Sequence, residues 1–294
     1  MGKKGKKAQA GKPKKLSPKD IGKRLDALVK KLEKELEGAD LFAPLPPAED
    51  CPICCTPLSH MLNRSVYKPC CGKAVCGGCH AEHTLVSENN GGGLGLCPFC
   101  RAPELGGLDF VRQLDARFSS HNDKDASLVL GYSYSAGKHV PKDLMKAMSY
   151  FITAAELGSA QACSNIGLHY NDGISISKDT EKAAFFYRAG AFRGCISSRD
   201  DIGSHEYEER NVETAIRHWK ISAEAGNQQS LDRLKTIFNG NLVGKDFISK
   251  EYMDNVYRAC HEAQKNVKSE SREKLGLVAT HTKEEKEMLD AAKC

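Results

Sequence analysis

The stretch DASLVLGYSYSAGKHVPKDLMKAMSYFITAAELGSA, residues 125–160, decides the fold because the chain repeats its pattern twice more. Its first landmark recurs twice, each time 36 residues further on, in the three runs Leu130-Gly131-Tyr132, Ile166-Gly167-Leu168 and Ile202-Gly203-Ser204. Self-similarity at a fixed period of this size is typical of repeat architectures, in which each unit buries its apolar face only against its neighbours.

Each unit is expected to be a pair of helices. The second helix of each pair carries a small residue and two adjacent aromatic side chains, and it closes at a glycine: Gly158, Gly194 and Gly226. Small residues permit close helix approach, and we expect the aromatic side chains to fill the groove of the next unit. The sequence therefore predicts three antiparallel helix pairs over residues 125–226, with no strand.

The spacing and letters of these units resemble Sel-1-like repeats, which are relatives of tetratricopeptide repeats. The resemblance implies a right-handed α-solenoid, assigned here to residues 125–238 with a capping half-repeat at its end. The third unit departs from the pattern at Asp200-Asp201 and Ser204-His205, where apolar and glycine positions are usual. A connecting helix is predicted at residues 108–124, a closing helix at 239–275 and a charged tail at 276–294.

The amino-terminal part divides into three segments. Residues 1–19 are rich in lysine and have almost nothing to bury, which predicts a disordered tail. Residues 20–37 predict an amphipathic helix, whose apolar positions are Ile21, Leu25, Leu28, Leu32 and Leu36. Its stripe can dock on the body of the same chain or on a second copy as a short coiled coil. Residues 38–50, with three prolines, form a stiff linker.

Composition and charge exclude several classes of protein. Mean hydropathy is −0.48, and no apolar run approaches the ~18 residues of a membrane span. The first residues are charged without an apolar stretch behind them, so a secretory signal is not expected. The net charge of +5 comes from the first 37 residues, because the remainder is slightly acidic. Contact with nucleic acid is therefore expected only through the lysine-rich tail, and the predicted location is the cytoplasm or the nucleus.

Nine of the thirteen cysteines lie between residues 51 and 100, and eight of them form four pairs. The pairs are Cys51 and Cys54, Cys70 and Cys71, Cys76 and Cys79, and Cys97 and Cys100. Three pairs have the Cys-x-x-Cys spacing that supplies two zinc ligands without strain, and zinc takes four such ligands in a tetrahedron. A cluster this dense outside an oxidising compartment predicts metal binding, with two zinc ions as cofactors.

The order and spacing of these pairs over residues 51–101 resemble a RING-type zinc finger. In that family the pairs interleave, so the resemblance assigns Cys51, Cys54, Cys76 and Cys79 to one ion and Cys70, Cys71, Cys97 and Cys100 to the other. Lys73 stands where most members have a histidine ligand, and the chain reads more like an all-cysteine variant. Cys70 is the preferred fourth ligand of the second ion, with His80 or His83 as alternatives. The predicted fold class is therefore mostly α, with a small two-zinc cross-brace RING module and an α-solenoid.

The resemblance also implies a function. A RING-type ubiquitin ligase docks a charged ubiquitin-conjugating enzyme and forms no covalent intermediate itself. By resemblance, Ile53 and Pro98 would line the docking groove and Arg101 would donate hydrogen bonds to the enzyme and to ubiquitin. The repeats would recruit a protein substrate or adaptor. The alternative is a non-catalytic scaffold, in which zinc finger and repeats serve protein–protein interaction alone.

Overall fold

The computed structural model describes residues 17–58, 65–89, 95–240 and 242–266. This part of the chain is mostly helical, with one two-stranded antiparallel sheet. The elements are α1 (Pro18–Leu36), β1 (Ser65–Lys68), β2 (Lys73–Cys76), α2 (Gly77–Asn89), α3 (Gly107–His121), α4 (Lys124–Ala136), α5 (Leu144–Glu156), α6 (Ala160–Asp172), α7 (Thr180–Phe192), α8 (Ile196–Glu208), α9 (Val212–Glu224), α10 (Gln228–Asn239), the 3₁₀ turn η2 (Lys245–Phe247) and α11 (Lys250–Asn266). None of the described helices is long and apolar enough to cross a membrane.

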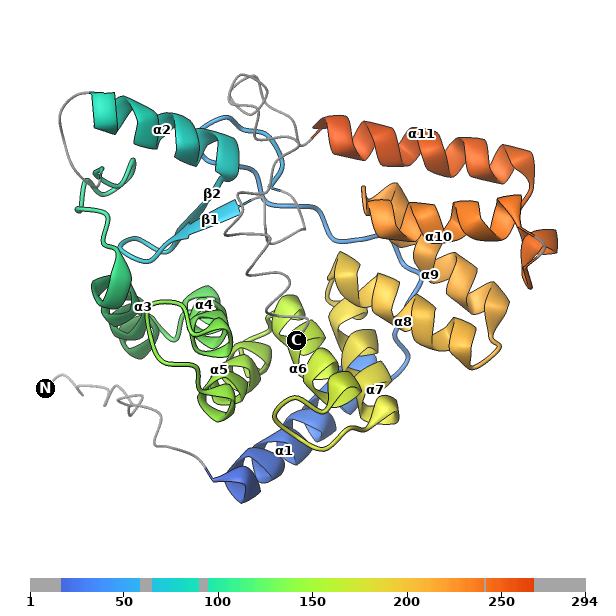
Figure 1. The fold of residues 1–294 in the computed structure, drawn as a ribbon, viewed down its shortest axis with the longest axis horizontal. Coiled ribbons are helices and arrows are strands. Elements are labelled where there is room, and N and C mark those ends of the chain that lie inside the picture. Colours follow the sequence, from blue (N-terminus) through green and yellow to red (C-terminus); the bar gives the residue numbers. More distant parts are fainter. Residues whose placement is uncertain (1–16, 59–64, 90–94, 241, 267–294) are drawn as a thin grey trace, which may run out of the picture.

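The repeats form a solenoid of helix pairs, α4 with α5, α6 with α7 and α8 with α9, and each pair contacts the next. Figure 1 shows them following one another from α3 round to α11, with the cysteine-rich module beside α3. Within the described residues of the predicted repeat segment there is no strand. Gly158, Gly194 and Gly226 follow the helix ends with the same φ of 95°, a conformation that a side chain would strain.

Each helix pair is held together where a glycine of the first helix faces an aromatic ring of the second. A Cβ atom at Gly167 would lie 2.7 Å from the Tyr187 ring, and one at Gly203 would lie 2.7 Å from the Trp219 indole. Gly131 faces Phe151 in the same way. The prediction that these aromatics fill the groove of the next unit was therefore incomplete, because the second ring of each pair packs on the glycine of its own unit.

Helix α1 docks on the body of the same chain. Ser17 caps it in a reciprocal pair with Asp20, and Pro18 starts it. Its apolar stripe is buried against α5 and α7 at Ile21, Leu25, Leu28 and Leu32. Of the two partners left open by the sequence, the structure shows the intramolecular one.

Charged side chains at both ends of α1 fix its position on the solenoid. Arg24 donates to Glu156 at 2.8 Å and to Thr153 at 2.9 Å. Arg193 pairs with Glu35 at 2.7 Å and donates to the Ala155 carbonyl at 2.9 Å. Because Arg193 is mostly buried, this second pair adds orientation as well as attraction.

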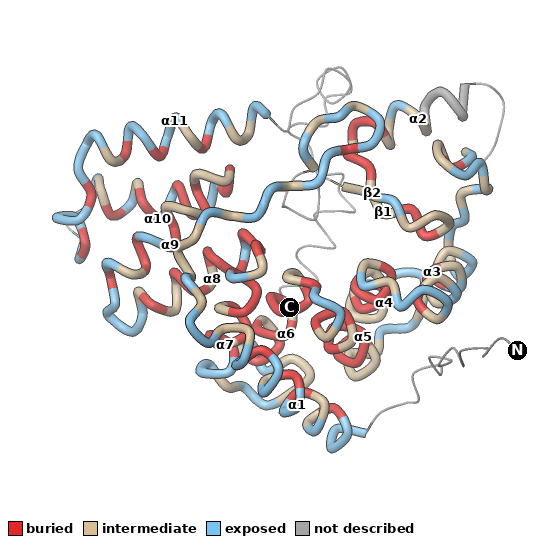
Figure 2. Tube along the Cα trace, turned by 180° about the vertical axis from the view of Figure 1, so that it is seen from behind, coloured by how far each residue is buried: buried red, intermediate tan, exposed pale blue. Residues whose placement is uncertain are grey.

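The carboxyl-terminal region differs from the single helix expected at 239–275. Helix α10 ends at Asn239, and α11 does not begin until Lys250. Gly240 is extended and Gly244 has a φ of 104°, so the backbone leaves the helical region at both glycines. Residues 267–275, the predicted charged tail at 276–294 and most of the predicted lysine-rich tail at 1–19 lie outside the described residues. Figure 2 shows that α11 is exposed along much of its length.

Replacing Leu28 with Ala should lower the free energy of unfolding by about 2–5 kcal/mol, because the side chain is 1% exposed in the α1 interface. Urea denaturation followed by circular dichroism measures this loss. Lys30→Ala on the exposed face of the same helix is the control and should change it by less than about 0.5 kcal/mol. An unfolding midpoint of the parent that rises with protein concentration would instead indicate that α1 binds a second copy.

The third repeat predicts a pH dependence of stability. Burial, and then the neighbouring Asp200, raise the pKa of Asp201 from 3.8 to about 7, although Arg233 opposes the shift and Asp172 adds to it. A carboxyl group whose pKa is raised by folding favours the folded state while protonated, and this advantage is lost as pH rises from about 4 to about 7. Asp201→Asn should therefore stabilise the protein at pH 8, on the order of 1–3 kcal/mol, and should give no gain near pH 4. Asp246→Asn, at an exposed aspartate, is the control for urea titrations at both pH values.

Candidate metal centre

Two Cys-x-x-Cys turns, Cys51–Cys54 and Cys97–Cys100, are here called the first and second knuckle. They have the same backbone conformation and lie at the two ends of the cysteine-rich module. In the first, the Cys55 amide donates to the Cys51 carbonyl at 2.8 Å. In the second, the Arg101 amide donates to the Cys97 carbonyl at 3.1 Å. Both knuckles close with an isolated β-bridge, and Cys55 and Arg101 both have positive φ, 52° and 60°. Each knuckle thereby turns two cysteine side chains toward the same point.

The first group of thiols joins the first knuckle to the end of the hairpin. Cys51 and Cys54 meet Cys76, the last residue of β2, and Cys79, in the first turn of α2. The Cys54 and Cys76 sulfurs lie 3.8 Å apart, and the backbone amides of Cys76 and Cys79 each point at a sulfur at 3.4 Å. Amide donors of this kind favour the thiolate form that binds metal.

The second group joins the hairpin turn to the second knuckle. Cys70 and Cys71 lie between β1 and β2, and they meet Cys97 and Cys100. The Cys71 and Cys97 sulfurs are 3.8 Å apart. Gly72 has a φ of 72° and allows the chain to turn directly after the two adjacent cysteines. The missing spacer between Cys70 and Cys71 therefore does not keep either sulfur out of the group.

Both groups fit a tetrahedral metal ion. Within each group the four sulfurs all lie within 4.8 Å of one another. A tetrahedron with metal–sulfur bonds of about 2.3 Å has edges of about 3.8 Å. The Cys54–Cys76 and Cys71–Cys97 sulfur pairs have this separation, 3.8 Å. Two sets of four cysteines can therefore hold two metal ions, and four thiolate ligands in a tetrahedron suit zinc.

Burial, hydrogen bonds and neighbouring sulfurs shift the pKa values of the thiols. Burial raises the pKa of Cys79, and the neighbouring Cys76 and Cys54 raise it further. For Cys54, burial is outweighed by hydrogen bonds from Thr56 and from its fellow cysteines, which lower the pKa to about 6. Cys97 has a pKa lowered to about 7, because amide hydrogen bonds from its own knuckle outweigh burial. Each group thus contains one thiol whose pKa lies below its ordinary value.

The predicted alternatives to Cys70 lie elsewhere. His80 Nδ1 is 2.9 Å from the ammonium of Lys68, a buried lysine that also pairs with Glu104. His83 is in neither group of four cysteines. Lys73 places its ammonium 4.7 Å from the centre of the Phe99 ring, so it supports the second knuckle by a cation–π contact.

The three residues predicted to bind a conjugating enzyme lie on the knuckles and are accessible. Ile53 is 44% exposed, a high value for a large apolar side chain. Pro98 is half-buried and Arg101 is exposed. Within the described part of the chain, the Arg101 guanidinium has no hydrogen bond or ion pair.

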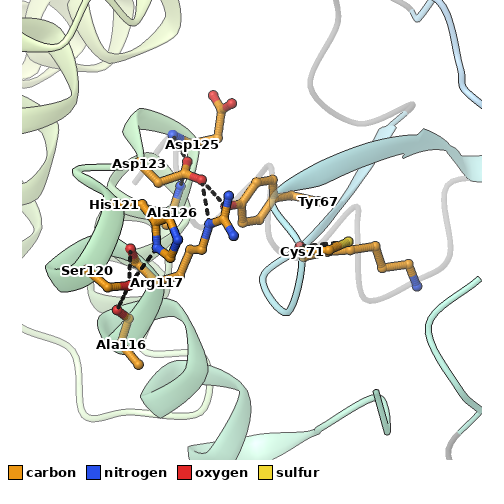
Figure 3. Close-up of polar contacts among 10 residues, drawn as sticks. Tyr67, Cys71, Ala116, Arg117, Ser120, His121, Asp123, Asp125 and Ala126 are labelled. Carbon is orange, nitrogen blue, oxygen red and sulfur yellow. Dashed lines mark hydrogen bonds and ion pairs between the residues drawn. The ribbon is translucent and has the colours of Figure 1, made fainter. Parts of the chain in front are cut away.

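Asp123 joins the cysteine-rich module to the solenoid, a connection that was not predicted from the sequence. One carboxylate oxygen accepts from the Tyr67 hydroxyl of β1 at 2.7 Å and from Arg117 of α3 at 3.0 Å (Figure 3). The other oxygen caps α4 by accepting the amides of Asp125 and Ala126. Burial would raise the pKa of Asp123, but these four hydrogen bonds lower it overall.

Arg117, which is hydrogen-bonded to Asp123, also contacts the turn of the second group of cysteines. Its guanidinium lies over Gly72, so that a Cβ atom there would collide with it. The cap position before residue 124 is visible in the sequence, but its contact with Tyr67, 56 residues away, is not.

Comparison with known proteins supports the repeats. The Sel1 repeat family model matches residues 125–159, 160–194 and 203–227, so the chain carries three Sel1 repeats in a mostly helical solenoid. A Sel1 repeat protein from Oxalobacter formigenes is a similar solved structure, 25% identical over 53% of this chain and 64% of that one, with a TM-score of 0.47. Another is c5321, a protective antigen of uropathogenic Escherichia coli displaying an SLR fold, 25% identical over 57% of this chain and 35% of that one, with a TM-score of 0.42.

The chain spans less than two thirds of the length of either solved protein. No curated protein sequence matches it. The third repeat match begins only at residue 203, so the charged residues 199–201 of α8 fall outside it.

The purified chain should contain two zinc ions. Elemental analysis should find two per chain in the parent and one in Cys54→Ser or in Cys100→Ser, since each variant disrupts one group of ligands. Cys163→Ser in the solenoid is the control and should retain both ions. One ion or none in the parent would contradict the two-site arrangement.

Proposed function

We propose that residues 51–101 are a RING-type module and that the protein is a ubiquitin ligase, in which the repeats recruit a protein substrate or adaptor. The observation that carries the proposal is the interleaving of the cysteine pairs. The first pair gathers with the third and the second with the fourth, which is the cross-brace order of that family.

The accessible residues on the knuckles support the proposed docking role. Ile53 offers an apolar contact on the first knuckle, and Pro98 is a partly exposed residue of the second, directly after Cys97. The Arg101 backbone is held by the left-handed turn that closes the second knuckle, and the donors of its guanidinium are unoccupied within the described residues. A planar guanidinium with five donors can bridge two acceptors, one on the enzyme and one on ubiquitin.

In this mechanism the module performs no covalent step. Zinc, when bound, supplies structural cross-links that keep the knuckles in place. Ile53 and Pro98 bind the conjugating enzyme, and Arg101 restricts the motion of the attached ubiquitin. Holding the thioester in one reactive pose raises the rate because the entropy cost of orientation is met before the reaction begins.

The second candidate function is a scaffold that binds proteins without transferring ubiquitin. The Sel1 repeats favour it, because stacked helix pairs present extended surfaces suited to protein partners. The two functions differ in one measurable property, the discharge of ubiquitin from a loaded conjugating enzyme onto free lysine. A parent protein that discharges no member of a broad enzyme panel is a scaffold.

Replacing Arg101 with Ala should slow discharge by about ten- to a hundredfold, because the loss of charge-assisted hydrogen bonds costs about 1.5–3 kcal/mol in the reactive complex. Zinc content should not change, since arginine ligates no metal. Single-turnover discharge of a loaded enzyme measures the rate. Arg112→Ala, at an arginine whose side chain is 76% exposed on α3, is the matched control and should react like the parent.

Ile53→Ala should act differently, by weakening the binding of the conjugating enzyme whether or not it carries ubiquitin. Titration calorimetry with the free enzyme separates the two effects, since Arg101→Ala should leave that affinity nearly unchanged. Equal discharge by the parent and Arg101→Ala would remove the role assigned to Arg101.

A further inference from the structure

Residues 40–46, here called the strap, lie against the third repeat in the manner of a bound peptide. The buried Arg199 of α8 donates to the Leu41 carbonyl. The Phe42 ring lies 4.8 Å from the His218 ring and 3.7 Å from the Arg217 guanidinium, both on α9. Pro46 covers Gly194, where an added Cβ atom would lie 2.6 Å from its ring.

The strap has the form of a short linear ligand. The Asp40 carboxylate accepts the Phe42 amide at 2.9 Å and so holds the aromatic side chain toward the solenoid. Pro44, Pro46 and Pro47 follow, and their fixed φ favours an extended backbone. The helices thus bind one carbonyl, one aromatic ring and one proline.

Two of the residues beneath the strap, Arg199 and His218, are specific to the third repeat. Arg199 takes the place of Ser127 and Cys163 in the first two units, and His218 takes the place of Tyr150 and Phe186. Both side chains are only 2% exposed. Arg199 Nε and His218 Nδ1 have no hydrogen-bond partner among the described residues.

Buried polar atoms without partners lower stability and are uncommon in a purely structural core. Here both atoms belong to side chains that contact the strap, Arg199 through the Leu41 carbonyl and His218 through the Phe42 ring. A ligand with further polar groups would satisfy them.

The site also extends beyond the strap. A hollow of about 380 Å³ adjoins Phe42, with Ile216, Phe247 and Tyr252 among its lining residues. Phe247 is 52% exposed there. Charged side chains of both signs line it as well: Glu213, Arg217, Lys220 and Glu224. Phe42 fills only part of this surface, so a longer ligand would gain apolar contacts that the strap does not make.

We propose that this surface of α8 and α9 is a peptide-binding groove for an extended segment of a partner protein that carries an aromatic side chain followed by prolines. The strap occupies the groove as an intramolecular competitor. This inference does not rest on ubiquitin transfer, because it concerns binding to the repeats alone.

The competition sets the design of the test. A tethered segment acts at an effective concentration in the millimolar range, so it excludes an identical free peptide at ordinary concentrations. Weakening the strap should therefore expose the groove. The probe is a fluorescein-labelled synthetic peptide of residues 39–48, and fluorescence anisotropy with the full chain measures its binding.

Phe42→Ala should bind the peptide at least about tenfold more tightly than the parent. Adding Arg217→Ala should reverse the gain, and a peptide in which alanine replaces the phenylalanine should bind neither protein. Phe192→Ala, at a 39% exposed phenylalanine of α7, is the matched control and should behave like the parent. Pro46→Ala weakens the strap by an independent contact and should also increase binding.

Two results would overturn the proposal. The first is that the Phe42→Ala and Pro46→Ala proteins bind the labelled peptide no more tightly than the parent does, or that adding Arg217→Ala does not reverse the gain in affinity. The other is a parent dimer that Phe42→Ala abolishes in sedimentation velocity, since the groove would then take the strap of a second copy. A monomeric parent supports the proposal.

Discussion

The contact between a helix glycine and an aromatic ring, repeated in three helix pairs, is the constraint on which the rest of the structure depends. Gly131, Gly167 and Gly203 let Phe151, Tyr187 and Trp219 lie directly on the backbone of the partner helix. This close approach fixes the spacing of the two helices within each pair, and the stacked pairs leave continuous surfaces along the solenoid. Helix α1 occupies one of these surfaces on α5 and α7, and the strap continues along the chain to α9.

The sequence predicted features that depend on local spacing and missed those that depend on distant contacts. The 36-residue period, the apolar stripe of α1 and the cysteine pairs are all visible in short windows, and the Sel1 match supports the first of them. The strands Ser65–Lys68 and Lys73–Cys76 were not predicted, because each has only four residues and the hairpin is set by the turn that presents Cys70 and Cys71. Asp123, Tyr67 and the residues under the strap were missed because their partners lie far away in sequence.

The third repeat shows how a departure from a repeat pattern can carry information. Its α8 places Arg199, Asp200 and Asp201 where the other units have small, apolar or amide side chains. Arg199 holds the strap, while Asp200 accepts the Ser230 hydroxyl at 2.7 Å and pairs with Arg233 at 3.2 Å, both on α10. Two of the three charges thus bind elements outside the repeat, on opposite sides in sequence. Charged residues at apolar repeat positions identify the unit where the regular stack ends and other segments attach.

The cysteine-rich module is consequently held to the solenoid from both ends of its sequence. On the amino-terminal side the strap leads from the groove on α9 to Cys51, and on the carboxyl-terminal side α3 carries Arg117 to the turn beside Cys71. The described residues of the module bury few apolar side chains, so its shape depends on the two groups of sulfurs and on these contacts with the solenoid. The Asp123 carboxylate accepts hydrogen bonds both from Tyr67 of the module and from the first turn of α4. Asp123 therefore links a hydrogen bond of the module to the cap of α4. This shared carboxylate helps to determine how the knuckles are oriented relative to the repeats.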